Sequence, residues 1–217
     1  MGTTDSQHPR EPIVRSIDLW HVVVLAAGRG RRMGGPKALM GVGGRAWWEV
    51  QEERLGAAGV RRLWVVSPEV RAGMRGCGSR MVDGDADAPM FASVRMGIEA
   101  VLGESGTRGV MVLPVDVPAP GRAVVEALVK GAERGPAAPV WRGKRGHPVA
   151  LPREWIEGVF VPACGRGGVL RLDELVGAEL EEVGVEDQSV VVNLNTPEDV
   201  TQWERGANAA TDSPDDL

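Results

Sequence analysis

The chain has 217 residues, 43% hydrophobic and 25% charged, which is typical of a globular protein with a sizeable core. Its formal net charge of −5 argues against a broad nucleic-acid-binding surface, because such a surface needs a basic face. Two cysteines, Cys77 and Cys164, are too few for a disulfide framework, and no segment has the pattern of a signal peptide or a membrane span. We therefore expect a reduced, cytoplasmic protein.

Both ends of the chain differ in composition from its middle. Residues 1–18 are polar and interrupted by prolines, which predicts a flexible N-terminal segment. Residues 206–217 are small, acidic and without periodicity, which predicts a disordered tail. Residues 19–205 contain no internal repeat and no low-complexity linker, so we expect them to form one domain.

Between these ends, apolar runs alternate with helical patterns. The expected strands are Trp20–Ala26, Arg62–Ser67, the weaker Met81–Val82, Gly109–Val115, Ala137–Trp141 and Val190–Asn193. The expected helices are Ala46–Ala58, Met90–Val101, Gly121–Ala132, Pro152–Glu157, Val169–Leu175 and Pro197–Arg205. This alternation predicts an α/β fold with a mostly parallel central sheet flanked by helices, in which ligands bind at the carboxyl ends of the strands.

The first expected strand runs directly into a glycine-rich loop, GRGRRMGGPK, that ends at Lys37. Its glycines leave backbone N–H groups open to a polyanion, and its three arginines supply opposing charge. A dinucleotide-binding turn is the alternative, but it needs neither Pro36–Lys37 nor these arginines. It would also need an acidic ribose-binding residue at the end of the second strand, which here ends in Ser67–Pro68. The chain has 25 lysine and arginine residues, of which three are lysines, so Lys37 stands out as a compact charge. The loop therefore predicts a nucleoside triphosphate site.

A carboxylate, Asp116, follows the strand Gly109–Val115 directly and precedes Pro118. An unpaired buried carboxylate is costly, so Asp116 needs a cation, a helix cap or solvent. Alone, it is best explained as a cap for the helix that begins near Gly121. Beside a triphosphate loop, Mg²⁺ is the natural cation, because one or two carboxylates, phosphate oxygens and waters suffice to bind it.

Two later segments carry further polar groups. In the segment WRGKRGHPVALP, Gly146 and His147 are equally explained by a substrate-facing turn and by an ordinary strand entry, and we assign His147 no proton-transfer role. In NLNTPED, Thr196 and Pro197 form a strong helix start. That start leaves Asn193 and Asn195 available to bind a ligand or to help position a metal.

These motifs, in this order, resemble those of the MobA- and MocA-like nucleotidyltransferases, which act in molybdenum cofactor synthesis. The family pattern LAAGxGxRMGxxK corresponds to Leu25–Lys37, and the aspartate before proline to Val115–Pro118. The patterns GxxGHP and NTPED correspond to Gly143–Pro148 and Asn195–Asp199, and MFASVRMG resembles the family's serine-containing turn. The resemblance covers roughly residues 20–203.

The resemblance implies a single Rossmann-like, GT-A-like nucleotidyltransferase domain with a mixed sheet. In the implied reaction, a substrate phosphate attacks the α-phosphorus of an NTP and pyrophosphate leaves. The implied catalytic residues are Lys37, Arg32 and Asp116, with Mg²⁺ held by Asp116 and Asn195. The implied nucleotide-binding residues are Leu25, Ala26, Ala27, Gly28, Gly30, Arg32, Lys37 and Ser93. The implied acceptor-side residues are Gly146, His147, Asn193 and Asn195.

Three departures from the family pattern bear on the substrates. Asn193 and Asn195 replace acids that cytidylyltransferases of this group often carry, which favours GTP, whereas Ala27 stands where the guanylyl branch has glycine, which favours CTP. The element GDxGAR is replaced around Cys164. We expect CTP slightly ahead of GTP, with molybdopterin as the acceptor. A sugar phosphate or small alcohol phosphate acceptor is one alternative. A non-catalytic relative that hands nucleotide or cofactor to a molybdenum enzyme is another.

Overall fold

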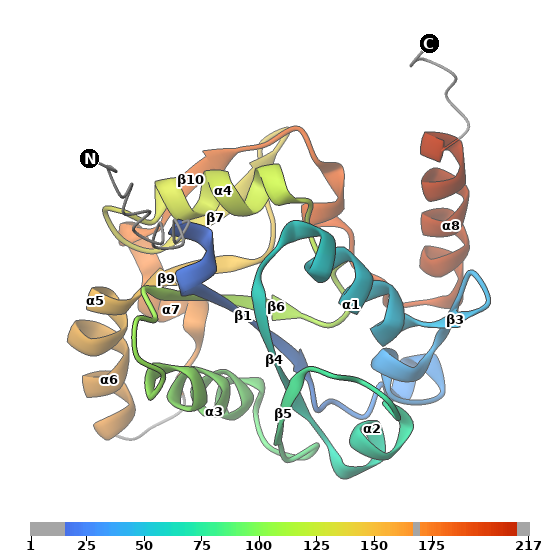
Figure 1. Cartoon of the computed structure of the whole chain (residues 1–217), viewed down its shortest axis with the longest axis horizontal. Helices are drawn as coiled ribbons and strands as arrows, with labels where there is room; N and C mark the ends of the chain where they lie inside the picture. The colour runs from blue at the N-terminus through green and yellow to red at the C-terminus, as the bar shows by residue number, and fades with distance from the viewer. Residues whose placement is uncertain (1–15, 167–169, 212–217) are drawn as a thin grey trace, which may run out of the picture.

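The computed structural model describes residues 16–166 and 170–211, which are built around one central sheet. Its strands follow one another along the chain with helices between most of them (Figure 1). They are β1 (Trp20–Ala26), β4 (Arg61–Val66), β5 (Arg80–Asp83), β6 (Gly109–Pro114), β7 (Ala137–Trp141), β8 (Lys144–Arg145), β9 (Val149–Pro152) and β10 (Glu181–Gly184). A separate two-stranded ribbon joins β2 (Gly41–Val42) to β3 (Arg45–Ala46).

The strand order is β10-β7-β9-β6-β1-β4-β5, and β8 pairs with β7 outside this path. β1 lies between β6 and β4 and is parallel to both, and β4 is parallel to β5. β9 runs antiparallel to β6 and β7, whereas β10 is parallel to β7. The predicted α/β fold with a mostly parallel mixed sheet is therefore confirmed.

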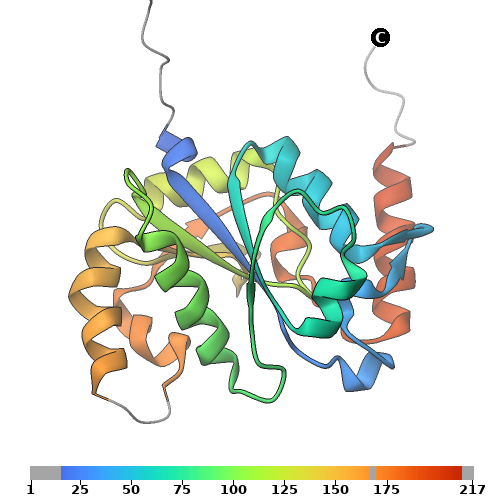
Figure 2. The ribbon, with the colours of Figure 1, turned by 60° about the horizontal axis from the view of Figure 1, so that its bottom comes forward.

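Helices cover both faces of the sheet (Figures 1 and 2). Alternate residues of β1 enter different cores: Val22 and Val24 pack into one, and Val23 and Leu25 into the other. The first core includes residues of α1 (Trp47–Ala58), α2 (Pro68–Gly73), α4 (Arg122–Gly131) and α8 (Pro197–Thr211). The second includes residues of α3 (Met90–Leu102), α5 (Arg153–Trp155) with the following π-helix Ile156–Phe160 and α6 (Val161–Gly165), and α7 (Leu172–Val176).

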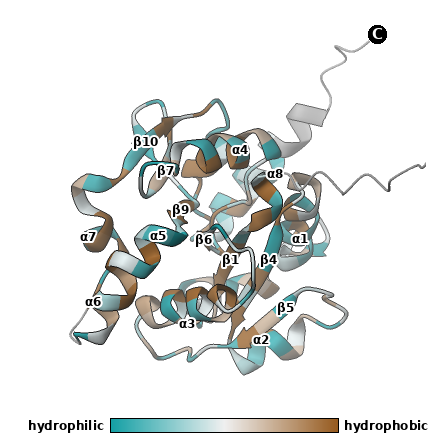
Figure 3. Ribbon diagram, turned by 60° about the vertical axis from the view of Figure 1, so that its left-hand side comes forward, coloured by the Kyte–Doolittle hydropathy of each residue, from teal (hydrophilic) through white to brown (hydrophobic). Residues whose placement is uncertain are grey.

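The innermost strands are apolar along their whole length, as expected for strands covered on both faces. All seven residues of β1 are buried, and so are five of the six residues of β6. Figure 3 shows the hydrophobic colour concentrated on β1 and β6, with hydrophilic residues on the outward sides of the helices. Among the described residues, no helix combines the length and the apolar character needed to cross a membrane.

The predicted strand Val190–Asn193 is wrong. The chain there forms a 3-10 helix, Gln188–Val191, and the place beside β7 is taken by β10, which the sequence analysis did not identify. A short apolar run has no periodicity that separates a strand from another buried segment, and Val190 is buried by packing rather than by pairing.

Several element bounds also differ from the sequence-based expectations. The helix expected over Pro152–Glu157 begins at Arg153 and continues without a break to Gly165, and β9 precedes it. The expected helix at Val169 begins at Leu172, and Val169 itself lies outside the described residues. The last helix continues to Thr211 instead of ending at Arg205. In the segment expected to be flexible, residues 16–18 belong to a 3-10 helix with Ile17 buried.

Candidate active site

The glycine-rich loop and Asp116 lie side by side because they follow neighbouring parallel strands. Leu25 of β1 is in register with Pro114 of β6. Beyond the ladder, the Val115 N–H donates to the Leu25 carbonyl at 3.1 Å. The sheet thus brings the loop after β1 and the aspartate after β6 to the same edge, where α/β folds bind ligands.

Gly30 shapes the glycine-rich loop. Its φ of 57° is in the left-handed region, and its carbonyl accepts hydrogen bonds from Met33 N at 2.8 Å and Gly35 N at 3.3 Å. A Cβ at this position would lie 1.9 Å from the Gly35 carbonyl oxygen. The tight turn therefore requires glycine here. Arg29 anchors the outside of the loop through a two-point ion pair with Asp87.

A cavity of about 240 Å³ lies between this loop, the start of α3 and Asp116. Six of the eight predicted nucleotide-binding residues line it: Leu25, Ala27, Gly28, Gly30, Lys37 and Ser93. Ala26 does not, because its side chain packs into the core on the opposite face of the sheet. Arg32 is exposed on a one-turn 3-10 helix and forms no ion pair with any other described residue.

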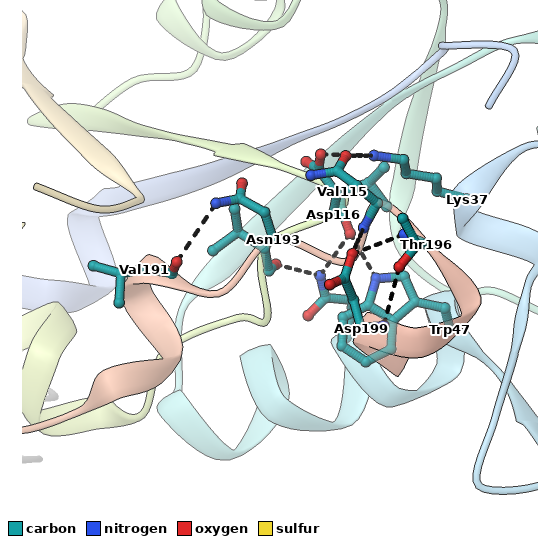
Figure 4. Close-up of polar contacts among 11 residues, drawn as sticks. Lys37, Trp47, Val115, Asp116, Val191, Asn193, Thr196 and Asp199 are labelled. Atoms are coloured by element: carbon teal, nitrogen blue, oxygen red, sulfur yellow. Dashed lines mark hydrogen bonds and ion pairs between the residues drawn. The ribbon is translucent and has the colours of Figure 1, made fainter. Parts of the chain in front are cut away.

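Lys37 and Asp116 line this cavity and face each other (Figure 4), and Asn195 joins them through Lys37. The Lys37 Nζ donates to Asp116 Oδ2 at 2.8 Å and to Asn195 Oδ1 at 2.5 Å. The Lys37 and Asp116 side chains are 18% and 22% exposed, so their ion pair is partly shielded from water. Three segments far apart in the sequence thus contribute to one charged cluster.

The N-terminus of α8 holds Asn195 in place. Asp199 Oδ2 accepts hydrogen bonds from the backbone N–H groups of Asn195 at 2.9 Å and Thr196 at 2.8 Å. Thr196 Oγ1 in turn accepts from Asp199 N at 3.2 Å, which completes a reciprocal cap. The bonds from these N–H groups lower the pKa of Asp199. The cap residues therefore also fix the backbone that carries Asn195.

Asn193 does not join this cluster. It is exposed, and its side-chain amide donates to the Val191 carbonyl at 3.5 Å, pointing away from Lys37 (Figure 4). Asn193 follows the 3-10 helix rather than a strand, so the expectation that both asparagines extend from a strand end does not hold. Between them, Leu194 is buried and its N–H donates to the Asp116 carbonyl at 2.8 Å.

A second cavity, of about 680 Å³, adjoins the first through shared wall residues Leu25, Met90 and Pro114. Gly146 and His147 line it together with apolar side chains of α3, β6 and α7. His147 donates its backbone N–H to the Val190 carbonyl at 2.8 Å, and its Nδ1 is buried without a partner among the described residues. Burial lowers the pKa of His147, and the nearby Asp116 charge opposes this shift. A neutral imidazole therefore faces the larger cavity.

The residues around Lys37 include few metal ligands. Within residues 16–166 and 170–211, no group of three or more histidine, cysteine, aspartate or glutamate side chains is placed to hold a metal. Asp116 and Asn195 instead offer two oxygens that meet at the Lys37 ammonium. Oxygen ligands of this number suit Mg²⁺ that retains waters and phosphate oxygens, rather than an ion enclosed by protein.

Sequence reasoning missed two parts of this site. Asp87, which pairs with Arg29, lies in a loop without a recognisable motif. Gln51 is buried in α1 and makes hydrogen bonds to the backbone that follows β6. No local pattern marks either residue, since each acts through a contact with a distant segment.

Comparison with known proteins identifies the family of this chain and solved structures with a similar fold. The MobA-like NTP transferase domain model matches residues 22–172. No curated protein matches significantly. Rv0371c from Mycobacterium tuberculosis is similar in structure, with 22% identity, a TM-score of 0.70, and coverage of 87% of this chain and 99% of that one. A further structure of Rv0371c, 19% identical to this chain, contains manganese.

Two further solved structures are similar. The 2-C-methyl-D-erythritol 4-phosphate cytidylyltransferase from Thermus thermophilus is 22% identical, with a TM-score of 0.64 and coverage of 87% of this chain and 98% of that one. The molybdopterin-guanine dinucleotide biosynthesis protein A from Archaeoglobus fulgidus is 16% identical, with a TM-score of 0.65 and coverage of 87% and 99%. At these identities the structures establish a shared fold. Since the family model spans more than half of the sequence, the chain belongs to the MobA-like NTP transferase domain family.

Proposed function

We propose that this protein is an Mg²⁺-dependent nucleotidyltransferase that moves a nucleotide from an NTP to a phosphate-bearing acceptor. The proposal is based on the convergence of Lys37, Asp116 and Asn195 beside the smaller of two adjoining cavities. The smaller cavity has the glycine-rich loop on its wall and accounts for the nucleotide. The larger cavity accounts for the acceptor. The charged cluster then lies where the two substrates meet.

The reaction needs alignment and charge neutralisation more than proton transfer. An acceptor phosphate oxygen forms a bond to the α-phosphorus, and the bond from that phosphorus to the pyrophosphate oxygen breaks. The nucleophile is already an anion, so no general base is required. Loop N–H groups and Arg32 bind the β- and γ-phosphates, and Lys37 neutralises charge that grows on the α-phosphate.

Asp116 and Asn195 are the groups that would hold Mg²⁺. When bound, Mg²⁺ supplies positive charge that stabilises the triphosphate and the leaving pyrophosphate. The manganese in Rv0371c supports a divalent ion in this fold. Lys37 would give up its ion pair with Asp116 to reach the α-phosphate, because the ammonium and a metal ion would compete for this carboxylate.

The base pocket favours CTP slightly over GTP. Ala27 is 4% exposed and lies on the cavity wall, where its methyl group takes up space that glycine would leave to a purine. Ser93, on α3, lies on the same wall and is placed to contact the base or the ribose. The size of this pocket is therefore the argument for a pyrimidine.

Molybdopterin is the proposed acceptor, in the cytoplasm, with delivery to a molybdenum enzyme as the next step. The family description and the name of the Archaeoglobus fulgidus neighbour support it. Gly146 and His147 on the wall of the larger cavity are the acceptor-side residues. The name of the Thermus thermophilus neighbour favours a second candidate, a small alcohol phosphate.

Release of pyrophosphate tests the proposal. The protein is incubated with Mg²⁺, each of the four NTPs, and either molybdopterin or 2-C-methyl-D-erythritol 4-phosphate. We expect turnover with molybdopterin, faster with CTP than with GTP. If pyrophosphate is released only with the alcohol phosphate, that compound rather than molybdopterin is the acceptor. If nucleotide binds but no combination of NTP and acceptor gives pyrophosphate, the proposed enzymatic function is wrong and the protein is a nucleotide-binding protein.

A further inference from the structure

One face of α1 is aimed at the backbone that carries Asp116. Trp47, Gln51 and Arg54 are spaced i, i+4 and i+7, which places them on the same side of a helix. Each donates a side-chain hydrogen bond to a carbonyl of residues 115–119. We call these three side chains the loop-holding face of α1.

Gln51 makes the most extensive contacts of the three. Its Nε2 donates to the Val117 carbonyl at 2.8 Å and to the Val115 carbonyl at 3.2 Å. Its Oε1 accepts from Ala119 N at 2.6 Å. The residue is completely buried, so water does not replace these bonds. A single side chain thus joins three backbone groups across the segment that contains Asp116.

Trp47 and Arg54 extend this contact in both directions. Trp47 Nε1 donates to the Val115 carbonyl at 2.6 Å (Figure 4), and Arg54 Nε donates to the Ala119 carbonyl at 2.6 Å. Arg54 also lies over the Trp203 ring, with its guanidinium carbon 5.4 Å from the ring centre. Both ends of the 115–119 backbone are therefore bound to α1.

This segment needs external donors because it belongs to neither a helix nor a strand. Val115, Val117 and Ala119 are buried, and a buried carbonyl without a partner is costly. The Asp116 carbonyl is held from the other side, by Leu194 N at 2.8 Å. The backbone on both sides of Asp116 is thus fixed, which determines where its carboxylate can point.

We propose that Gln51 is a positioning residue for the transfer reaction: it holds the 115–119 backbone so that the Asp116 carboxylate faces Lys37 and the metal. The inference rests on the proposed function, because it assigns Gln51 a purpose only if Asp116 binds the metal. Gln51 is buried and lines neither of the two cavities. Its effect is therefore expected in the metal dependence of the reaction rather than in nucleotide affinity.

The first test compares Gln51→Met with Leu55→Ala. Methionine keeps the length of the side chain and removes its hydrogen bonds. Leu55 is buried on the same helix and contributes apolar packing, so its truncation controls for loss of stability. At a temperature where both variants are folded, we expect Gln51→Met to raise the Mg²⁺ concentration for half-maximal activity about tenfold and to lower kcat, with little change in the nucleotide KM. Leu55→Ala should leave the Mg²⁺ dependence unchanged.

A second variant, Gln51→Glu, adds a pH readout. A carboxylate facing two carbonyl oxygens is unfavourable, so the pKa of the introduced carboxyl group should be raised by burial and by these dipoles. Once protonated, that carboxyl group again donates to a carbonyl and accepts from Ala119 N. The ratio of variant to wild-type activity should therefore rise as pH falls. If Gln51 has only a packing role that does not involve these hydrogen bonds, the ratio of variant to wild-type activity should not change with pH.

Hydrogen exchange of residues 115–119 separates this inference from the proposed function. Faster exchange there in Gln51→Met than in Leu55→Ala supports the loop-holding role, even if no acceptor is turned over. Equal exchange, or an unchanged Mg²⁺ dependence in an active Gln51→Met protein, overturns it. Absent pyrophosphate release together with faster exchange overturns the proposed function and keeps Gln51 as a holder of the loop.

Discussion

The Lys37 ammonium lies 2.8 Å from Asp116 Oδ2, the carboxylate that would hold the metal ion in the proposed reaction. The two residues follow neighbouring strands, and both side chains are more than three-quarters buried. Lys37 therefore neutralises the Asp116 carboxylate in this structure. Under the proposed function, the Lys37 ammonium and a divalent ion would compete for this carboxylate, so metal binding would be coupled to release of the lysine.

Removing Lys37 should strengthen metal binding in the absence of nucleotide. We expect Lys37→Met to bind Mn²⁺ about fivefold more tightly, because a partly buried ion pair of roughly 1 kcal/mol no longer competes. Titration of free Mn²⁺ by electron paramagnetic resonance measures this. Lys144→Met, at an exposed hairpin lysine, is the matched control. Weaker Mn²⁺ binding in Lys37→Met than in the control would contradict the competition.

Gly30→Ala should disrupt the nucleotide loop. Alanine is strained at φ 57°, and its Cβ would overlap the Gly35 carbonyl oxygen. We expect a loss of at least about 1 kcal/mol in unfolding free energy and about tenfold in affinity for CTP. Denaturant unfolding and calorimetric titration measure the two effects. Gly35→Ala is the control, since its Cβ meets no atom within 4 Å. If Gly30→Ala and Gly35→Ala lose equal stability and equal affinity for CTP, nucleotide binding does not depend on glycine at position 30.

Ala27→Gly should shift base preference toward GTP. Removing the methyl group enlarges the wall of the smaller cavity, and we expect the ratio of kcat/KM for GTP to that for CTP to rise about tenfold. Ala26→Gly introduces the same flexibility at the neighbouring position, but Ala26 packs on the opposite face of the sheet. If this ratio rises equally in both variants, the change comes from added flexibility of the strand rather than from the size of the pocket.

His21 should make stability depend on pH. Burial lowers its pKa, although Glu104, whose Oε2 lies 3.0 Å from Nε2, opposes this. Below about pH 6.5, His21 is protonated in the unfolded chain, whereas in the folded protein its lowered pKa keeps the imidazole neutral to a lower pH. The stabilisation is therefore complete above that pH and is lost as pH falls through the folded pKa.

Unfolding in denaturant from pH 7.5 to 5 tests this. We expect His21→Leu to reduce the slope of unfolding free energy against pH, by no more than about 1.4 kcal/mol per pH unit. His147, whose pKa burial also lowers, accounts for part of the remaining slope in that variant. Parallel curves for wild type and His21→Leu would show that His21 takes up its proton equally in both states.

The sequence predicted the elements whose signals are local. β1 and β7 have the predicted bounds, and α1 and α3 differ by one residue, because long apolar runs and helical periodicity need no distant partner. The 3-10 helix at Gln188–Val191 was mistaken for a strand because its burial depends on where β10 pairs. Short strands such as β9 depend in the same way on their neighbours.

In the candidate site, too, residues within local motifs could be predicted, whereas those that depend on distant contacts could not. Lys37, Asp116 and Asn195 could be grouped from the sequence because each lies in a motif, and the topology of a parallel sheet brings strand ends together. Asn193 was included with Asn195, yet the turn between them directs the two side chains differently. Gln51 had no signal, since its role arises from hydrogen bonds to backbone that is 64–68 residues away in sequence.

Transfer at the Lys37–Asp116 pair is tested by measuring pyrophosphate release by Asp116→Asn, Lys37→Met and wild type with Mg²⁺, CTP and molybdopterin. Both variants should lose at least about a hundredfold in kcat. Lys37→Met should still bind Mn²⁺, whereas Asp116→Asn should not. If either variant releases pyrophosphate at the wild-type rate, nucleotidyl transfer does not take place at the Lys37–Asp116 pair.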